Sequence, residues 1–258
     1  MYPIWLQFGA IFVIGLVIGS FLTVCVTRIP LGQSIVFPRS RCSSCRTIIT
    51  WYDNIPLISF LLLRGQCRRC QQPIDPRYPL IELLNGLGYV WLFWHFGWGW
   101  PSAIYAGFFS VLLTVTWIDW DHQIIPDVIT LPGIVLGWVA ATVVLPIGWL
   151  DSLIGTLMGG GVLLVMAWVS PYLLGKEGLG GGDIKFLAMI GAFLGWKSAL
   201  ITLFFASVLG ASVGVGLLAC NMMQRGQYMP FGPFLAVGAF VSMLYGDRVL
   251  AWYWGLLL

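Results

Sequence analysis

Long runs of apolar residues, separated by short polar stretches, fill most of this 258-residue chain. A helix needs about 20 residues to cross the hydrocarbon core of a bilayer, and eight runs approach that length or are bounded by residues that end a helix. The runs are 4–26, 80–96, 102–118, 131–145, 153–174, 184–194, 199–220 and 231–245. The pattern predicts an all-α polytopic membrane protein with about eight transmembrane helices.

Apolar segments lie at both ends of the chain. Residues 249–258 are apolar but too short to span, so we expect them to lie in the interface or against the bundle. The first run lacks a basic leading segment and a small-residue cleavage site, so we expect it to stay in the mature protein. It carries Gly15, Gly19 and Ser20 at helical spacing, which predicts a face packed closely against another helix.

One extended polar interval, residues 28–79, interrupts the apolar pattern. It is rich in Arg, Cys, Pro and Gln and has weak periodicity, which predicts turns and short strands around a cross-link or a metal. The chain thus divides into a first transmembrane helix (1–27), a small insert (28–79) and a transmembrane bundle (80–258).

The amino-acid composition is typical of a membrane protein, and the net charge bears on whether nucleic acid is a partner. The chain is 59% hydrophobic and 9% charged, whereas soluble domains average roughly 25% charged residues. Fourteen Trp suit interfacial anchoring in a lipid bilayer. A net charge of +3 gives no reason to expect a nucleic-acid partner.

The distribution of charge predicts the orientation. Eight of the 13 Lys and Arg residues fall between Arg28 and Arg77, so the positive-inside rule places this insert in the cytoplasm and the N-terminus outside. Counting eight spans from there puts eleven of the 13 basic residues inside.

Two aspartates occupy corresponding positions in this topology. Asp119 directly follows the run 102–118, and Asp183 directly follows the three glycines 180–182. In the predicted topology, both aspartates therefore lie at cytoplasmic helix ends. Two carboxyl groups at one site share a proton, because like charges a few ångströms apart cannot both ionise easily. Such a pair suits peptide hydrolysis, in which one carboxylate takes a proton from water while the protonated partner polarises the carbonyl. Gly180 and Gly182 would leave room for an extended peptide, with Lys185 in the same loop.

Other interpretations of these residues stay open. Asp121 could replace Asp119, although Asp121 and Asp127 look more exposed. The acids could be interhelical loop charges that pair with Lys176 or Lys185. They could also bind a cation in a proton-coupled transporter, although such sites tend to lie near the bilayer midplane, and a scaffold without chemistry is a third alternative. The glycines do not match a phosphate-binding or dinucleotide-binding loop.

Four cysteines form two C-x2-C pairs in the insert. The pairs are Cys42 with Cys45 and Cys67 with Cys70, separated by 21 residues. Two such knuckles can close a tetrahedral structural zinc site, which leaves no open position for catalysis. Two disulfides are the main alternative, but a cytoplasmic location is reducing.

Several motifs in order resemble the type IV prepilin peptidases, membrane aspartic proteases of the G-x-G-D type. Besides the two aspartates and the cysteine pairs, the matching segments are Gly19-Ser20-Phe21-Leu22, Arg28-Ile29-Pro30, Arg77-Tyr78-Pro79-Leu80-Ile81-Glu82, Gly180-Gly181-Gly182-Asp183 and Pro230-Phe231-Gly232-Pro233.

The resemblance implies a bifunctional enzyme of the bacterial inner membrane. Its catalytic pair would be Asp119 and Asp183. It would remove the basic leader from type IV prepilins or type II secretion pseudopilins on the cytoplasmic side. It would then methylate the new N-terminal amine with S-adenosylmethionine, an activity that the cysteine-bearing insert would support. Glu82 is a candidate for orienting that amine, or simply a charged residue at a helix start.

Overall fold

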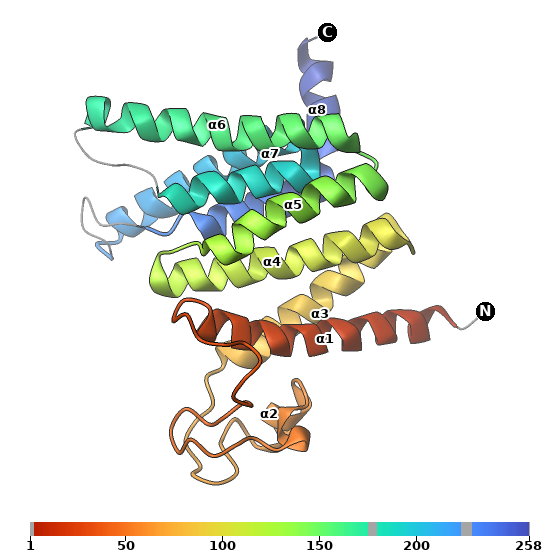
Figure 1. Cartoon of the computed structure of the whole chain (residues 1–258), viewed down its shortest axis with the longest axis vertical. Helices are drawn as coiled ribbons and strands as arrows, with labels where there is room; N and C mark the ends of the chain where they lie inside the picture. Colours follow the sequence, from red (N-terminus) through yellow and green to blue (C-terminus); the bar gives the residue numbers. More distant parts are fainter. Residues whose placement is uncertain (1–2, 175–179, 223–228, 258) are drawn as a thin grey trace. The chain divides into compact units, whose positions relative to one another are not determined.

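The computed structural model describes residues 3–174, 180–222 and 229–257. Helices and two isolated bridges make up the regular structure of these residues. The helices are α1 (Ile4–Arg28), η1 (Trp51–Asn54), α2 (Ile58–Leu62), α3 (Arg77–Phe96), α4 (Trp100–His122), α5 (Asp127–Val143), α6 (Gly148–Leu174), α7 (Gly181–Ala219) and α8 (Gly232–Leu257) (Figure 1). They form two compact units, residues 1–114 (unit 1) and 115–258 (unit 2).

In unit 1, helix α1 packs on α3 through glycine (Figure 1). A Cβ at Gly15 would lie 2.7 Å from the Cα of Gly86, and one at Gly19 would lie 2.7 Å from the Cα of Glu82. Backbones can approach this closely only where side chains are missing. The predicted small-residue face on the first helix is therefore confirmed.

A buried hydrogen-bonded network fixes the register of this helix pair. The Asn85 amide donates to the carbonyl oxygen of Gly15 at 2.8 Å and accepts from the hydroxyl of Ser110 at 2.8 Å. Tyr89 and Ser110 hydroxyls lie 3.0 Å apart. An unsatisfied polar group in an apolar interior is costly, so each bond favours one relative position of α1, α3 and the first part of α4.

The insert contains two turns of the same design, 25 residues apart. The first turn holds Cys42 and Cys45, and the second holds Cys67 and Cys70. In each, the N–H of the first cysteine donates to a carbonyl five residues later, and its carbonyl accepts from the N–H four residues later. The residue after the second cysteine has positive φ, 57° at Arg46 and 56° at Gln71. Isolated bridges flank both turns, so the expected strands are reduced to single bridge pairs.

In unit 2, helix α7 contacts α5, α6 and α8. Glycine again allows the closest approach, because a Cβ at Gly155 of α6 would collide with the carbonyl oxygen of Gly191 on α7. Residues 186–195 of α7 are all buried. Helix α7 is therefore the central helix in the packing of unit 2, and Asp183 lies in its first turn.

The prediction of eight membrane spans is only partly supported. Among the described residues, five helices are long and apolar enough to cross a membrane: α1, α4, α6, α7 and α8. The runs 184–194 and 199–220 join into α7, which is interrupted at Gly195 (φ 79°, ψ 172°). Helix α5 has 17 residues. The final apolar segment, which was predicted to lie in the interface or against the bundle, continues helix α8 as far as Leu257.

Candidate active site

Asp119 lies in the last turn of α4 and is nearly buried, with 5% of its surface exposed. Its Oδ2 accepts a hydrogen bond of 2.8 Å from the backbone N–H of Gly232, the first residue of α8. The N-terminal N–H groups of a helix have no intrahelical acceptor and suit a carboxylate. One oxygen of Asp119 is thereby held at the start of a helix more than 100 residues away in sequence.

Asp183 lies in the first turn of α7 and is half-buried. Gly180, the residue before the helix, hydrogen bonds the Asp183 carboxyl through its backbone. The charge of Asp119 acts on the same carboxyl, so the two acids are within electrostatic reach of each other. The two aspartates that the sequence selected therefore lie at the ends of two helices in unit 2, and their role as a catalytic pair stays a prediction.

The glycines beside Asp183 are required by close neighbours. A Cβ at Gly182 would lie 2.9 Å from the Cβ of Ile125, and one at Gly180 would lie 3.2 Å from Oδ2 of Asp183. Side chains here would push the loop after α4 away from the start of α7. Gly178 and Leu179, which begin the glycine-rich stretch in the sequence, lie outside the described residues.

Lys185 binds a different acid from the catalytic candidates. Its Nζ lies 2.7 Å and 2.6 Å from the two carboxylate oxygens of Asp127, at the start of α5. This ion pair ties α5 to the first turn of α7. Pairing of Lys185 with Asp119 or Asp183, which the sequence left open, is therefore not seen, and Lys176 lies outside the described residues.

Burial separates Asp119 from the other acids of its region. Asp121 and Asp127 are exposed, as is His122. His95, the second histidine, packs its ring edge-on against Phe96 with 4.8 Å between centroids. Asp119 and Asp183 both belong to unit 2, whereas His95 belongs to unit 1.

The four cysteines of the insert form one cluster in unit 1. All four sulfur atoms lie within 4.8 Å of one another, and the Cys42 and Cys70 sulfurs are 3.8 Å apart. None of the six cysteines of the chain is in a disulfide. Zinc–sulfur bonds of about 2.3 Å in a tetrahedron place sulfurs about 3.8 Å apart, so the cluster fits such an ion.

The local hydrogen bonds favour thiolates at two of these positions. The side chain and backbone of Thr47 lower the pKa of Cys45 to about 6. Backbone N–H groups of Cys70 and Arg69 lower the pKa of Cys67. The N–H of Gln72 favours a thiolate at Cys70 as well, but burial and the neighbouring cysteines raise the pKa of Cys70 to about 11. Four sulfurs this close therefore need a cation before all can ionise.

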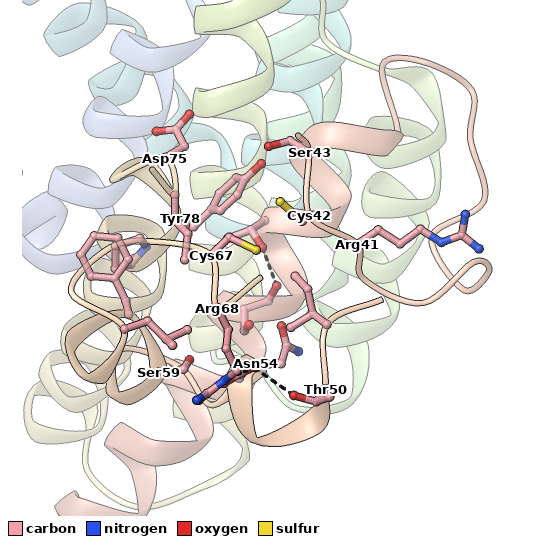
Figure 2. Close-up of a pocket in the computed structure, with 18 of the residues that line it drawn as sticks. Arg41, Cys42, Ser43, Thr50, Asn54, Ser59, Cys67, Arg68, Asp75 and Tyr78 are labelled. Atoms are coloured by element: carbon pink, nitrogen blue, oxygen red, sulfur yellow. Dashed lines mark hydrogen bonds and ion pairs between the residues drawn. The ribbon is translucent and has the colours of Figure 1, made fainter. Parts of the chain in front are cut away.

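Glu82 is a buried acid on α3, also in unit 1, with 8% of its surface exposed. Its Oε2 accepts a 2.9 Å hydrogen bond from the N–H of Leu57, a residue with positive φ (59°). Glu82 borders a cavity of about 410 Å³ that is lined by the insert and by the ends of α1 and α3. Figure 2 labels other residues of this lining, among them Cys42, Cys67 and Tyr78. Glu82 is thus more than a charged residue at a helix start.

Comparisons with known proteins agree with this geometry. The profile of the bacterial peptidase A24 N-terminal domain matches residues 13–96, and that of the type IV leader peptidase family matches residues 106–215. A prepilin leader peptidase/N-methyltransferase of Aeromonas hydrophila is 37% identical over 277 residues, covering 96% of this chain and 94% of the relative. The chain belongs to the type IV leader peptidase family.

Further relatives in this leader peptidase family carry the same name. The one from Pseudomonas aeruginosa is 36% identical and covers 93% of this chain and 91% of its own length. The one from Myxococcus xanthus is 44% identical over 81% of this chain and 62% of its own length. No solved structure gave a significant match.

The structure adds one site residue of this leader peptidase that sequence reasoning missed. In the sequence Gly232 is only one residue of a segment that resembles the family, whereas in the structure its N–H is the hydrogen-bond donor to Asp119 and its Cα faces that carboxyl. The available signal was a glycine with prolines two residues before and one residue after it, at the start of an apolar run. Such a glycine marks a close backbone approach but does not say to what.

Proposed function

We propose that this chain is a membrane aspartic endopeptidase that removes the basic leader from type IV prepilins or type II secretion pseudopilins. The observation that carries the proposal is the meeting of Asp119 and Asp183 from two different helices, one nearly buried and the other half-buried. The names of relatives that cover over nine-tenths of the chain support this substrate class. Nothing observed favours the transporter alternative.

In the proposed reaction, the two aspartate carboxyls share one proton and together hydrolyse the peptide bond. One carboxylate of the pair removes a proton from a water molecule as that water attacks the scissile carbonyl, and the protonated partner hydrogen bonds the carbonyl oxygen. The two acids exchange roles when the amine leaves. The Gly232 N–H holds one oxygen of Asp119, so its other oxygen is the one available to the water.

The glycines would accommodate the substrate. A prepilin enters as a hydrophobic helix whose leader must become extended before its bond can be cut. Gly181, which is exposed with no atom near its missing Cβ, leaves space beside Asp183 for such a strand, flanked by Gly180 and Gly182. Lys185, held by Asp127, would keep this loop in position. The acidic pair would also attract a basic leader.

The second proposed activity is N-methylation of the newly exposed amine with S-adenosylmethionine. Its support is the name that the relatives share and the match to the N-terminal domain of the family. The Cys42, Cys45, Cys67 and Cys70 cluster would hold a structural Zn²⁺, which when bound offsets part of the negative charge of the thiolates and ties the two turns of the insert together. We assign this role to the insert (28–79), and peptidase chemistry to the bundle (80–258).

For the membrane, we propose the bacterial inner membrane, with the N-terminus periplasmic and both the insert and the aspartates cytoplasmic. The charge distribution supports this orientation. Eight crossings would require α3 and α5 to span in addition to the five long apolar helices, and α7, which is one of those five, to cross twice, once on each side of Gly195.

A direct test uses the purified chain in liposomes with a prepilin peptide and S-adenosylmethionine. Mass spectrometry should find a product shortened at the leader junction and carrying one added methyl group. An uncut peptide in the presence of folded protein would refute the peptidase assignment, and a cut but unmethylated product would refute the second activity alone.

A further inference from the structure

The cavity of unit 1 is built from segments that are far apart in sequence. Ser20 and Thr23 come from the end of α1, and Tyr78 and Glu82 come from the start of α3. The remaining walls come from η1, α2 and the two cysteine turns, including Cys42 and Cys67. Figure 2 shows side chains from these segments converging on one space. Its volume of about 410 Å³ is within the range of sites for small organic ligands.

The charges around the cavity are balanced. Three arginines and three acids line it: Arg41, Arg68, Arg69, Asp53, Asp75 and Glu82. A polyphosphate site would need an excess of positive charge or a glycine-rich helix start, and neither is found in this part of the structure. Equal numbers of cations and anions suit a ligand that carries an ammonium, a carboxylate and a further positive centre.

One wall of the cavity contains an aromatic ring next to an ion pair. Arg68 binds Asp53 through two nitrogens, with distances of 2.6 to 3.1 Å, and its guanidinium lies 5.6 Å from the ring centroid of Tyr52. Because this hydrogen bond holds the pKa of Asp53 below its usual range, the pair stays charged near neutral pH. The Tyr52 ring, 47% exposed, can stack on a heteroaromatic base.

Among the acids that line the cavity, Glu82 is the buried one, with 8% of its surface exposed. It lines the cavity from α3 and accepts the N–H of Leu57 on Oε2. A buried carboxylate attracts a positive group.

We propose that this cavity is the binding site of the S-adenosyl sulfonium methyl donor, with its adenine on Tyr52 and its sulfonium and the acceptor amine toward Glu82. This inference rests on the proposed methyltransferase function and assigns its location within the chain. It requires residues of unit 1 alone.

The reaction balances with the donor as the only co-reactant. The lone pair of the substrate amine forms the new N–C bond while the S–C bond of the donor breaks. The electron pair of that bond stays on sulfur, which becomes a neutral thioether. The nitrogen sheds one proton, which passes to the Glu82 carboxylate.

The test is photolabelling of the full chain in detergent with methyl-tritiated S-adenosylmethionine, followed by peptide mapping. The label should appear on peptides from residues 41–82 and be displaced by S-adenosylhomocysteine. Label confined to residues 115–258, or no saturable label, would overturn the proposal. Prepilin cleavage by the same sample reports on the peptidase separately, so a failure of one is distinguishable from a failure of the other.

Two variants from different walls sharpen the test. Tyr52→Ala removes the stacking surface and Thr23→Leu fills the cavity from α1, so each should weaken donor binding about tenfold or more. Tyr253→Ala, an exposed tyrosine of α8 (52%), is the matched control and should bind within twofold of the native protein. Metal content and thermal unfolding check that Tyr52→Ala keeps the insert folded. Native affinity in a folded Tyr52→Ala or Thr23→Leu protein would contradict the assignment.

Discussion

Burial distinguishes Asp119 from Asp121, although they are two residues apart on one helix. Successive residues of an α-helix are 100° apart, so residues i and i+2 point about 200° apart and to opposite sides. Asp119 faces the start of α8, whereas Asp121 is exposed. An acid that is withdrawn from water and held by one N–H is positioned for proton transfer, and a solvated one is not.

The rate of prepilin cleavage should be sensitive to substitution of Gly232, because this residue holds the Asp119 carboxyl. In Gly232→Ala the new Cβ would lie 2.7 Å from Oδ2 of Asp119, so the carboxyl must move. Displacement of a catalytic group by about 1 Å can cost about 100-fold in rate. We expect prepilin cleavage by Gly232→Ala to fall at least tenfold, measured as initial rate at equal protein level.

Gly161→Ala is the matched control, because nothing lies within 4 Å of a Cβ at Gly161 in α6. It should cleave like the native protein. Equal rates for the two alanine variants would show that the approach of Gly232 to Asp119 is unimportant.

The sequence could predict which acids matter but not what holds them. Asp119 and Asp183 were predicted because each lies directly beside an apolar run, where an ionisable residue is costly unless it has a function. The donor to Asp119 is 113 residues away in sequence, so only the packing of α8 against the end of α4 reveals it. Likewise, the acids nearest to Lys185 in sequence are Glu177 and Asp183, and only the fold reveals that Lys185 pairs with Asp127.

Among helices, α1 and α3 form the closest pair in unit 1. Gly15→Ala would place a Cβ 2.7 Å from the Cα of Gly86, which can be relieved only by separating the helices. Overpacking of this kind costs about 1–3 kcal/mol, more than the roughly 1 kcal/mol that alanine gains over glycine in a helix.

We therefore expect Gly15→Ala to lower the midpoint of thermal unfolding in detergent. Gly9→Ala, on the same helix with nothing within 4 Å, should leave the midpoint unchanged or raise it slightly. A Gly15→Ala protein as stable as Gly9→Ala would mean that α1 and α3 are not packed this closely.

The ion pair between α5 and α7 should contribute little to stability. The side chains of Lys185 and Asp127 are 40% and 54% exposed, and exposed pairs typically contribute about 0.2–1 kcal/mol. A double-mutant cycle with Lys185→Ala and Asp127→Ala should give a coupling energy in that range, smaller at high salt. A coupling of several kcal/mol would place the pair in a far less solvated setting.

The hydropathy pattern does not predict every helix boundary. The break between the runs 184–194 and 199–220 was predicted, and Gly195 supplies it with a positive φ. Whether such a break separates two spans or bends one helix depends on packing around it, which hydropathy does not encode. The same holds for α8, where Asp247 and Arg248 interrupt the apolar pattern while the helix continues.

At the scale of the whole molecule, the residues proposed for methylation belong to unit 1 and those proposed for cleavage belong to unit 2. The two activities should therefore be separable. Cys67→Ser removes one of the four sulfurs, so we expect bound metal and methylation both to fall sharply while leader cleavage persists.

Elemental analysis of the purified variant measures the metal directly. Cys220→Ser, at an exposed cysteine that follows α7, is the control and should keep its metal. Unchanged metal content in Cys67→Ser would contradict the assignment of the four-cysteine site.

The central claim is that Asp119 and Asp183 together cut the substrate. Leader cleavage of a prepilin in liposomes should be compared among the native protein, Asp119→Asn, Asp183→Asn and the exposed control Asp121→Asn, at matched membrane levels. We predict that Asp119→Asn and Asp183→Asn each abolish cleavage and that Asp121→Asn retains it. Cleavage that survives Asp119→Asn but is lost in Asp121→Asn would contradict this account of the active site.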